Sequence, residues 1–115
     1  MGYWIVVVDD EPFSLTNAKN LLREKNMRVS CLRSGADLLE FIKGHTPDLV
    51  LLDILMPDMD GFETYRALRS FEEKEGRAQL PVIFLTGEDS SETERRGLKA
   101  GASDFIHKPK ATTFG

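Results

Sequence analysis

Apolar residues along this chain gather in short continuous runs instead of alternating with polar ones. Three such runs occupy residues 3–8, 49–52 and 81–85. A strand without alternation is covered on both faces, which is typical of the central strands of a parallel sheet. Two weaker runs, at residues 27–32 and 103–107, predict outer strands of the same sheet.

The segments between these runs carry apolar residues at helical spacing. We expect Ser34 to cap the second helix, with Asp37 three residues further on, and Asp60 to cap the third. The alternation of strands and helices predicts an α/β fold, a parallel sheet with helices on both sides. The predicted helices span residues 14–25, 36–43, 62–75 and 91–100.

Composition indicates one globular domain and excludes several classes of function. The 115 residues carry a net charge of -4, which disfavours a general nucleic-acid-binding surface, because such a surface needs a basic stripe. No apolar run is long enough to cross a bilayer, and the acidic start does not have the pattern of a signal peptide. The single cysteine, Cys31, rules out an internal disulfide and is expected to pack in the core. We therefore expect a cytoplasmic protein without membrane contact.

Reactive side chains follow four of the five predicted strands. In an open α/β sheet, ligands bind beyond the carboxyl ends of the strands, so these side chains should meet at one edge. The second strand ends in residues 33–35, to which we assign no chemistry. The others are Asp9 and Asp10 after the first strand, Asp53 after the third, Thr86 after the fourth and Lys108 after the fifth.

Electrostatic repulsion limits how these groups can share a site. Two carboxylates about 4 Å apart repel by roughly 4 kcal/mol at an effective dielectric constant near 20. Asp9, Asp10 and Asp53 therefore need counter-ions, and Lys108 supplies only one positive charge. Mg²⁺ takes carboxylate ligands and often binds phosphate oxygens as well, so it is the natural additional cation. Thr86 and Lys108 can hold the other oxygens of a phosphoryl group, and Asp53 is then either a third metal ligand or a nucleophile that forms an aspartyl phosphate.

Each of these residues, taken alone, has an ordinary structural alternative. Either aspartate after the first strand could cap the helix that follows, Thr86 could be a strand-end hydroxyl, and Lys108 could be a solvated amine. His45 and His107 have no second histidine or cysteine at metal-ligand spacing, so we interpret both as structural or surface residues. The placement of the reactive set at successive strand ends favours a functional site over these separate explanations.

Four sequence blocks in this order resemble the receiver domain of a two-component response regulator. They are VVVDDEP at 6–12, DLVLLDILMPDMDGFE at 48–63, FLTGE at 84–88 and AGASDFIHKP at 100–109. The resemblance implies a flavodoxin-like fold, a doubly wound five-stranded parallel sheet with the strand order 2-1-3-4-5. It also implies that residues 1–115 form a single receiver domain.

The resemblance implies that Asp53 accepts a phosphoryl group from a phosphohistidine on a sensor histidine kinase or a phosphotransfer protein. Asp10 and Asp53 would ligate Mg²⁺, Asp9 would act mainly through bound water, and the backbone carbonyl of Leu55 would complete the protein ligands. The chain would then be a phosphorylation-switched signalling module that catalyses only its own phosphoryl transfer and autodephosphorylation.

The remaining family positions imply how the phosphoryl group is held and sensed. Thr86 would donate a hydrogen bond to one phosphoryl oxygen, and Lys108, with a cis bond to Pro109, would pair with another. Movement of Thr86 would let Phe105 turn inward as the switch residue, where many relatives carry tyrosine. Gly61 fits a place where the backbone packs too closely for a Cβ atom.

The sequence departs from the family pattern after Pro109. Receiver domains finish with a fifth helix, whereas only residues 110–115 follow here, so that helix is missing or truncated. We expect a fragment of a longer response regulator, with any output domain beyond Gly115. A cloning remnant, or a face covered by a partner or a swapped segment, are the alternatives. A homodimer through this face stays open.

Three rival functions remain beside the phosphorylated receiver. A pseudo-receiver would bind a protein partner without phosphorylation, and such chains usually lose part of the acidic set or the lysine. A Mg²⁺-dependent phosphatase with an aspartyl nucleophile usually carries a second acid two residues further on, where this chain has Leu55. A flavin-binding protein would need a phosphate-cradling loop after the first strand, and residues 9–14 are acidic instead.

Overall fold

A computed structural model of the chain describes residues 2–86 and the backbone of the strand at 104–107. It contains the five predicted strands and three of the four predicted helices, with bounds that differ from the predicted ones by one or two residues. The predicted helix at 91–100, Lys108–Pro109 and the tail lie outside the described residues. The elements are β1 (Trp4–Val8), α1 (Pro12–Arg23), β2 (Arg28–Leu32), α2 (Gly35–Phe41), β3 (Leu49–Asp53), α3 (Gly61–Glu75), β4 (Val82–Thr86) and β5 (Asp104–His107).

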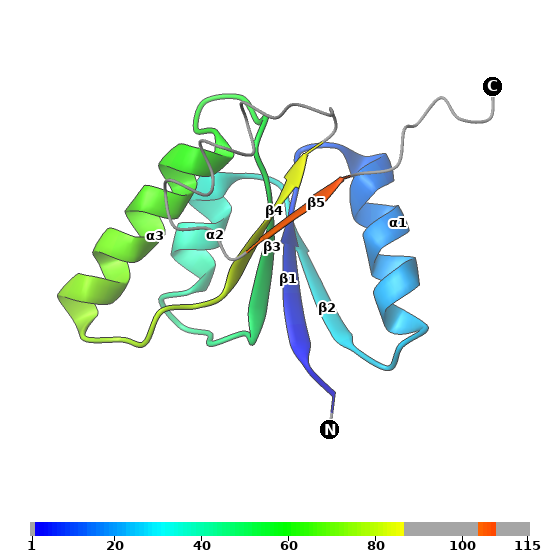
Figure 1. Cartoon of the computed structure of the whole chain (residues 1–115), viewed down its shortest axis with the longest axis horizontal. Coiled ribbons are helices and arrows are strands. Elements are labelled where there is room, and N and C mark those ends of the chain that lie inside the picture. The colour runs from blue at the N-terminus through cyan, green and yellow to red at the C-terminus, as the bar shows by residue number, and fades with distance from the viewer. Residues whose placement is uncertain (1, 87–103, 108–115) are drawn as a thin grey trace.

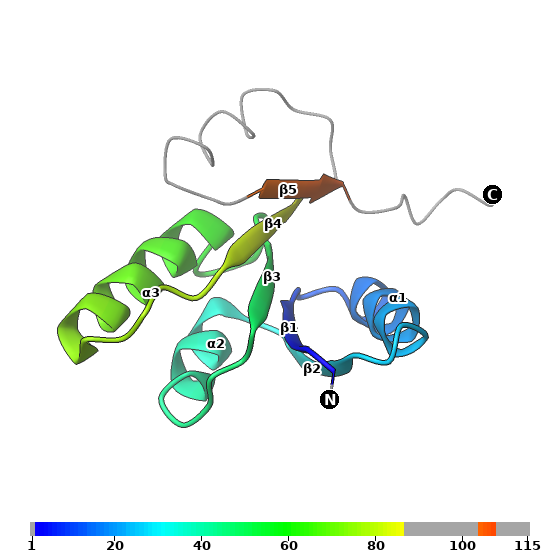
Figure 2. The same ribbon diagram turned by 60° about the horizontal axis from the view of Figure 1, so that its bottom comes forward.

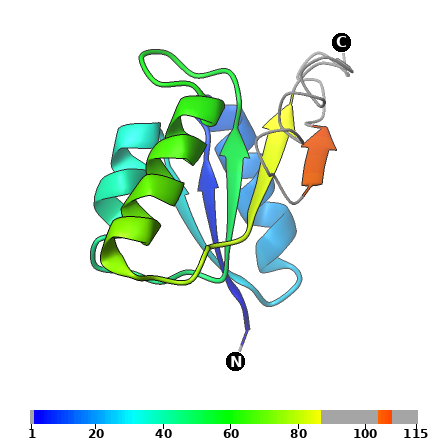
Figure 3. The same cartoon turned by 60° about the vertical axis from the view of Figure 1, so that its left-hand side comes forward.

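The strands form one parallel sheet in the order β2-β1-β3-β4-β5, which confirms the predicted topology (Figure 1). Helix α1 covers one face of the sheet, and α2 and α3 cover the other (Figure 2). Strands β1 and β3 lie side by side and point in the same direction, away from the N-terminus (Figure 3). The chain therefore has the doubly wound α/β architecture of the flavodoxin-like fold.

The continuous apolar runs are explained by a core on each face of the sheet. Val6, Val50 and Phe84 contribute to the core beneath α2 and α3. Val7 and Leu51 contribute to the smaller core beneath α1. Successive residues of a strand point to opposite faces, so a strand buried on both sides needs an apolar residue at every position.

Local capping chemistry sets where α2 and α3 begin. The Ser34 hydroxyl accepts a hydrogen bond from the backbone N–H of Asp37 at 3.0 Å. Asp60 and Glu63 form a reciprocal capping box at the start of α3. Both caps confirm the sequence prediction, because they depend only on residues three positions apart.

Neither Asp9 nor Asp10 is the N-cap of helix α1, which was the structural alternative considered for these two residues. Glu11 occupies the N-cap position, and Pro12 stands in the first turn, where its missing N–H costs no hydrogen bond. The Glu11 side chain does not cap the helix backbone, but accepts a hydrogen bond from the Ser14 hydroxyl at 2.9 Å. The interpretation of Asp9 or Asp10 as the helix cap is therefore wrong.

A cluster of ring side chains packs around Trp4 at the amino end of β1. The Trp4 ring meets the rings of Phe41 and His45 edge-on at 5.5 and 5.7 Å, and the Arg28 guanidinium lies 4.2 Å from its centre. His45 stacks on Phe41, and its Nδ1 lies 2.9 Å from the Phe41 carbonyl oxygen. The structural interpretation of His45 agrees with these contacts.

No helix in the described part of the chain is long and apolar enough to cross a membrane.

A buried carboxylate joins α3 to the start of β4. Glu72 is 4% exposed, and its two oxygens accept hydrogen bonds from Arg69 Nη1 at 2.8 Å and from the backbone N–H of Leu80 at 2.7 Å. The Arg69 guanidinium also lies over the Tyr65 ring, 4.5 Å from its centre. Breaking such a buried pair leaves the remaining donors without an acceptor, which is costly.

Cys31 packs against the core beneath α1, as predicted, and is half-buried. Its Sγ lies 3.9 Å from the backbone carbonyl oxygen of Leu15. Burial raises the pKa of the Cys31 thiol, an effect that the charge of Lys19 partly offsets. A thiol with a raised pKa holds less of the reactive thiolate at neutral pH.

Glu72→Gln should lower the free energy of unfolding by about 1–3 kcal/mol, because the new amide N–H₂ must face a donor of either Arg69 or Leu80. Urea unfolding followed by circular dichroism measures this loss. Glu73→Gln, at the exposed neighbouring position, is the matched control and should change stability by less than about 0.5 kcal/mol. Equal stability of the two variants would contradict a structural role for the buried carboxylate.

Cys31 should react with a disulfide reagent such as DTNB more slowly than a free thiol at pH 7.5, because its raised pKa and partial burial both reduce attack. The rate should rise to that of a free thiol when the protein is unfolded in urea. The reaction rate of the folded protein should keep rising at pH values where a free cysteine is already fully ionised, because the Cys31 pKa is higher. A folded-state rate equal to the unfolded-state rate would refute this prediction.

Candidate functional site

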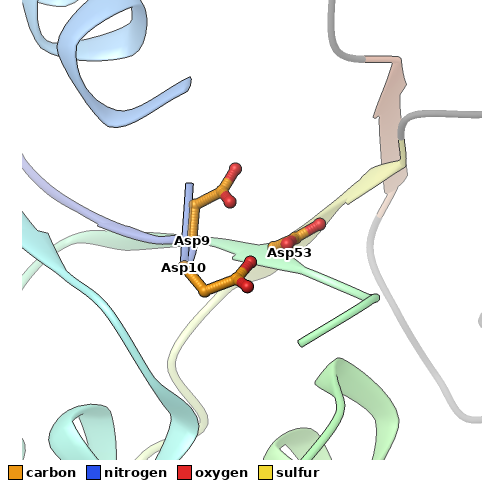
Figure 4. A group of neighbouring side chains, drawn as sticks. All are labelled: Asp9, Asp10 and Asp53. Atoms are coloured by element: carbon orange, nitrogen blue, oxygen red, sulfur yellow. The ribbon is translucent and has the colours of Figure 1, made fainter. Parts of the chain in front are cut away.

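Three carboxylates meet at the carboxyl ends of β1 and β3. Asp9 and Asp10 directly follow β1, and Asp53 is the last residue of β3. Each offers one oxygen to a group whose ligand atoms all lie within 4.8 Å of one another. Figure 4 shows the three side chains grouped at the ends of the two strands. The structure thus brings together the acidic residues that the sequence placed at one edge of the sheet.

Pairing of the strands fixes the separation between the two buried acids. Val8 of β1 is the register partner of Leu52 of β3. The next residue is Asp9 on the first of these segments and Asp53 on the second. Asp9 is 0% exposed and Asp53 is 2% exposed, whereas Asp10 is half-buried. The sheet itself therefore holds two carboxylates next to each other and out of water.

Backbone hydrogen bonds orient the loop that carries Asp9. The N–H of Asp9 donates to the carbonyl oxygen of Leu32 at 3.0 Å, which extends the β1–β2 ladder by one residue. The N–H of Glu11 donates to Asp9 Oδ1 at 3.0 Å. This hydrogen bond to the backbone just before α1 restricts the rotamer of the Asp9 side chain.

The donor set suits a hard divalent cation. Carboxylate oxygens are the ligands that Mg²⁺ prefers, and it commonly takes one or two of them while keeping several waters. Three negative charges this close together repel strongly where water is excluded, and a divalent ion would offset two of them. Asp9, Asp10 and Asp53 therefore fit a Mg²⁺ site.

The loop between β3 and α3 folds back tightly onto the end of β3. The N–H of Gly61 donates to the carbonyl oxygen of Ile54 at 2.8 Å, and Asp58 has a left-handed backbone with φ of 68°. A Cβ added at Gly61 would lie 2.4 Å from the carbonyl oxygen of Asp53 and 2.7 Å from Ile54 Cα. The close approach predicted at Gly61 is confirmed, and it presses the loop against the backbone of the site. The Leu55 side chain in this loop is 71% exposed, and its carbonyl ligand role stays a prediction.

Of the other predicted positions, the backbone places Thr86 at this edge. Thr86 is the last residue of β4 and directly follows Leu85, the register partner of Asp53. Phe105 lies in β5 opposite Phe84. The side chains of Thr86 and Phe105, and all of Lys108, lie outside the described residues, so their roles stay predictions.

One residue near the site was not assigned any chemistry from the sequence. Arg33 directly follows β2, and its Nη2 donates to the backbone carbonyl oxygen of Asp10 at 3.4 Å. The signal that could have found it is the strand order, because β2 lies beside β1 in the sheet. With that neighbour relation, the end of β2 necessarily lies next to the first acidic pair.

A family model described as the response regulator receiver domain matches residues 5–113. This chain belongs to the receiver domain family. The match covers both sheet strands that carry the acidic cluster and the positions of Thr86 and Lys108.

Several known proteins are similar to this receiver domain. A probable cyclic di-GMP phosphodiesterase of Vibrio cholerae is 38% identical over 105 residues, which are 91% of this chain but 23% of that protein. The N-terminal domain of a response regulator receiver protein from Methanoculleus marisnigri superposes with a TM-score of 0.84 at 32% identity, covering 97% of this chain and 89% of the other. The BeF3-activated receiver domain of Klebsiella pneumoniae RstA gives 0.80 at 36% identity, covering 96% and 92%.

A plant relative has been solved with ligands. The receiver domain of the Arabidopsis thaliana histidine kinase CKI1, complexed with Mg2+ and BeF3-, has a TM-score of 0.81 and 27% identity, covering 91% of this chain and 80% of that one. This chain spans about a quarter of the curated Vibrio relative, so the activity in that protein's name is not carried over to these residues.

Gly61→Ala should lower the free energy of unfolding by about 1–3 kcal/mol or more, because the added methyl meets fixed backbone atoms of Asp53 and Ile54. Thermal unfolding measures the loss. Gly44→Ala is the matched control, since a Cβ there meets nothing within 4 Å, and it should be close to neutral. If Gly61→Ala proved as stable as the control, the loop would not be pressed against β3 in solution.

Proposed function

We propose that this receiver domain is a phosphorylation-switched signalling module in which Asp53 accepts the phosphoryl group. The donor would be a phosphohistidine on a sensor histidine kinase or a phosphotransfer protein. The observation that supports this proposal is the group of carboxylate oxygens of Asp9, Asp10 and Asp53 within 4.8 Å at the ends of β1 and β3. A cluster of this kind is poorly suited to structure alone, because burial without a cation is unfavourable.

Asp10 and Asp53 would hold Mg²⁺ directly, with Asp9 acting through bound water and Leu55 through its carbonyl oxygen. The ion, when bound, supplies positive charge that offsets the negative charge of the incoming phosphoryl oxygens. The CKI1 receiver domain, solved with Mg2+ and BeF3-, supports the choice of metal. The sheet positions Asp53 and Asp9, so one direct ligand and the carboxylate that acts through water need little rearrangement.

Asp53 would act as the nucleophile. One of its carboxylate oxygens attacks phosphorus in line, the P–N bond of the phosphohistidine breaks, and the imidazole leaves with the electron pair. Burial of Asp53 removes its hydration shell, so its reactivity depends on fixed neighbours and not on water. Thr86 and Lys108 would hold the other phosphoryl oxygens, as the family pattern implies.

The product would change the charge at the end of β3. An acyl phosphate in place of a carboxylate adds up to one further negative charge at pH 7. Thr86 would move toward the phosphoryl group, and Phe105 would turn into the space that it leaves. Phenylalanine has no hydroxyl, so this switch would work through packing without an outward hydrogen bond. A cytoplasmic location and an output domain elsewhere in a longer protein belong to the same proposal.

A pseudo-receiver that binds its partner without phosphorylation is the second candidate. The retention of Asp9, Asp10 and Asp53 in one cluster favours the phosphorylated module, because a scaffold has no use for repelling buried charges. The Mg²⁺-dependent phosphatase is disfavoured by Leu55, which cannot act as the second acid. A homodimer is compatible with either candidate.

Incubation with acetyl phosphate should add one phosphoryl group to the folded protein, as measured by intact-mass spectrometry. The gain should require Mg²⁺, so EDTA should abolish it, and Asp53→Asn should abolish it under all conditions. Asp58→Asn is the matched control, because this exposed aspartate lies outside the cluster and asparagine tolerates its left-handed backbone. Absence of any gain from folded wild-type protein would support the pseudo-receiver instead.

A further inference from the structure

Arg33 lies beside the acidic cluster although no part of the phosphorylation chemistry uses it. Its Nη2 donates to the backbone carbonyl oxygen of Asp10 at 3.4 Å. The carbonyl and the carboxylate of one aspartate are only a few bonds apart. The guanidinium therefore lies within roughly one Debye length, about 8 Å at physiological ionic strength, of the nearest carboxylate of the cluster.

The sheet sets this position. Leu32, the last residue of β2, pairs with Val8 and accepts the N–H of Asp9 at 3.0 Å. Arg33, the next residue, contacts Asp10, the next residue of the neighbouring segment. Two successive residues at the end of β2 thus contact two successive aspartates, so the guanidinium is carried to the cluster by the strand register.

The charge on Arg33 is permanent, because a guanidinium does not lose its proton in proteins. The side chain is exposed, so water and salt weaken its field but do not cancel it at short range. A positive charge here stabilises the metal-free cluster but opposes the binding of a cation. It relieves the repulsion among three carboxylates when no metal is present, and it repels a divalent cation that enters the same cluster.

We propose that Arg33 is a resident counter-ion of the metal-free acidic cluster and thereby weakens the affinity of the cluster for Mg²⁺. The proposal rests on the proposed function, because it assigns Mg²⁺ to Asp10 and Asp53. Arg33 acts through the charge of the cluster and is not a ligand. Its presence raises the Mg²⁺ concentration at which the receiver domain becomes competent for phosphorylation.

Arg33→Gln is the decisive variant, because the amide keeps a hydrogen-bond donor but removes the charge. Arg33→Lys keeps the charge and is expected to behave like wild type. Arg23→Gln is the matched control, since it removes one exposed arginine charge from the last turn of α1, at the end of the helix opposite the acidic cluster. Each protein is titrated with Mg²⁺ by isothermal titration calorimetry at low and at high sodium chloride, and its thermal unfolding is recorded in EDTA.

At low salt, Arg33→Gln should bind Mg²⁺ about two- to tenfold more tightly than wild type, and high salt should shrink the difference. In EDTA at low salt, its unfolding midpoint should fall below that of Arg23→Gln, because a positive charge close to the cluster has been removed. A role in loop structure alone would instead weaken Mg²⁺ binding at every salt concentration.

The proposal is overturned if Arg33→Gln and Arg23→Gln have the same Mg²⁺ affinity, or if Arg33→Gln binds Mg²⁺ more weakly than wild type. Wild-type protein that binds no Mg²⁺ would count against the proposed function. The unfolding series in EDTA then decides the counter-ion role separately, since it contains no metal. Equal midpoints of the two arginine variants at low salt would refute that role.

Discussion

The mutual repulsion of carboxylates at the ends of β1 and β3 is the constraint on which the rest of the site depends. Asp9 and Asp53 are almost fully buried, and a parallel ladder of hydrogen bonds keeps their strands together. The favourable burial of the valines and leucines below them stabilises an arrangement that charge alone would drive apart. The core of the sheet therefore keeps the two buried carboxylates side by side.

Buried carboxylates at the two ends of the sheet have different surroundings. At the amino end of β4, the carboxylate of Glu72 is satisfied within the protein by Arg69 and the backbone of Leu80. At the carboxyl ends, three carboxylates share a space that suits an external cation. The Glu72 arrangement contributes to stability, whereas the role proposed for the acidic cluster is to bind a cation from solution.

Most of the fold could be predicted because its determinants are local. The unbroken apolar runs specify strands covered on both faces, and the caps at Ser34 and Asp60 depend on neighbours three residues away. The acidic cluster could also be predicted, since parallel strands place their ends at one edge. The implied strand order already places the end of β2 beside the first acidic pair, so the position of Arg33 could have been predicted, but the contact of its side chain with the Asp10 carbonyl could not. The burial of Glu72 could not be predicted either, because it depends on the approach of the distant backbone of Leu80 to α3. The roles of Thr86, Phe105 and Lys108 depend on side-chain positions that the described residues do not include.

The aromatic group at the start of β1 has a practical consequence. Trp4 is the single tryptophan of the chain, and its indole packs against Phe41 and His45 at the amino end of a strand whose other end leads into the acidic cluster. Its fluorescence emission depends on the packing around the amino end of β1, and the four strand residues 5–8 lie between it and Asp9. The domain thus carries an intrinsic optical probe of the packing at the end of β1 that lies away from the acidic cluster.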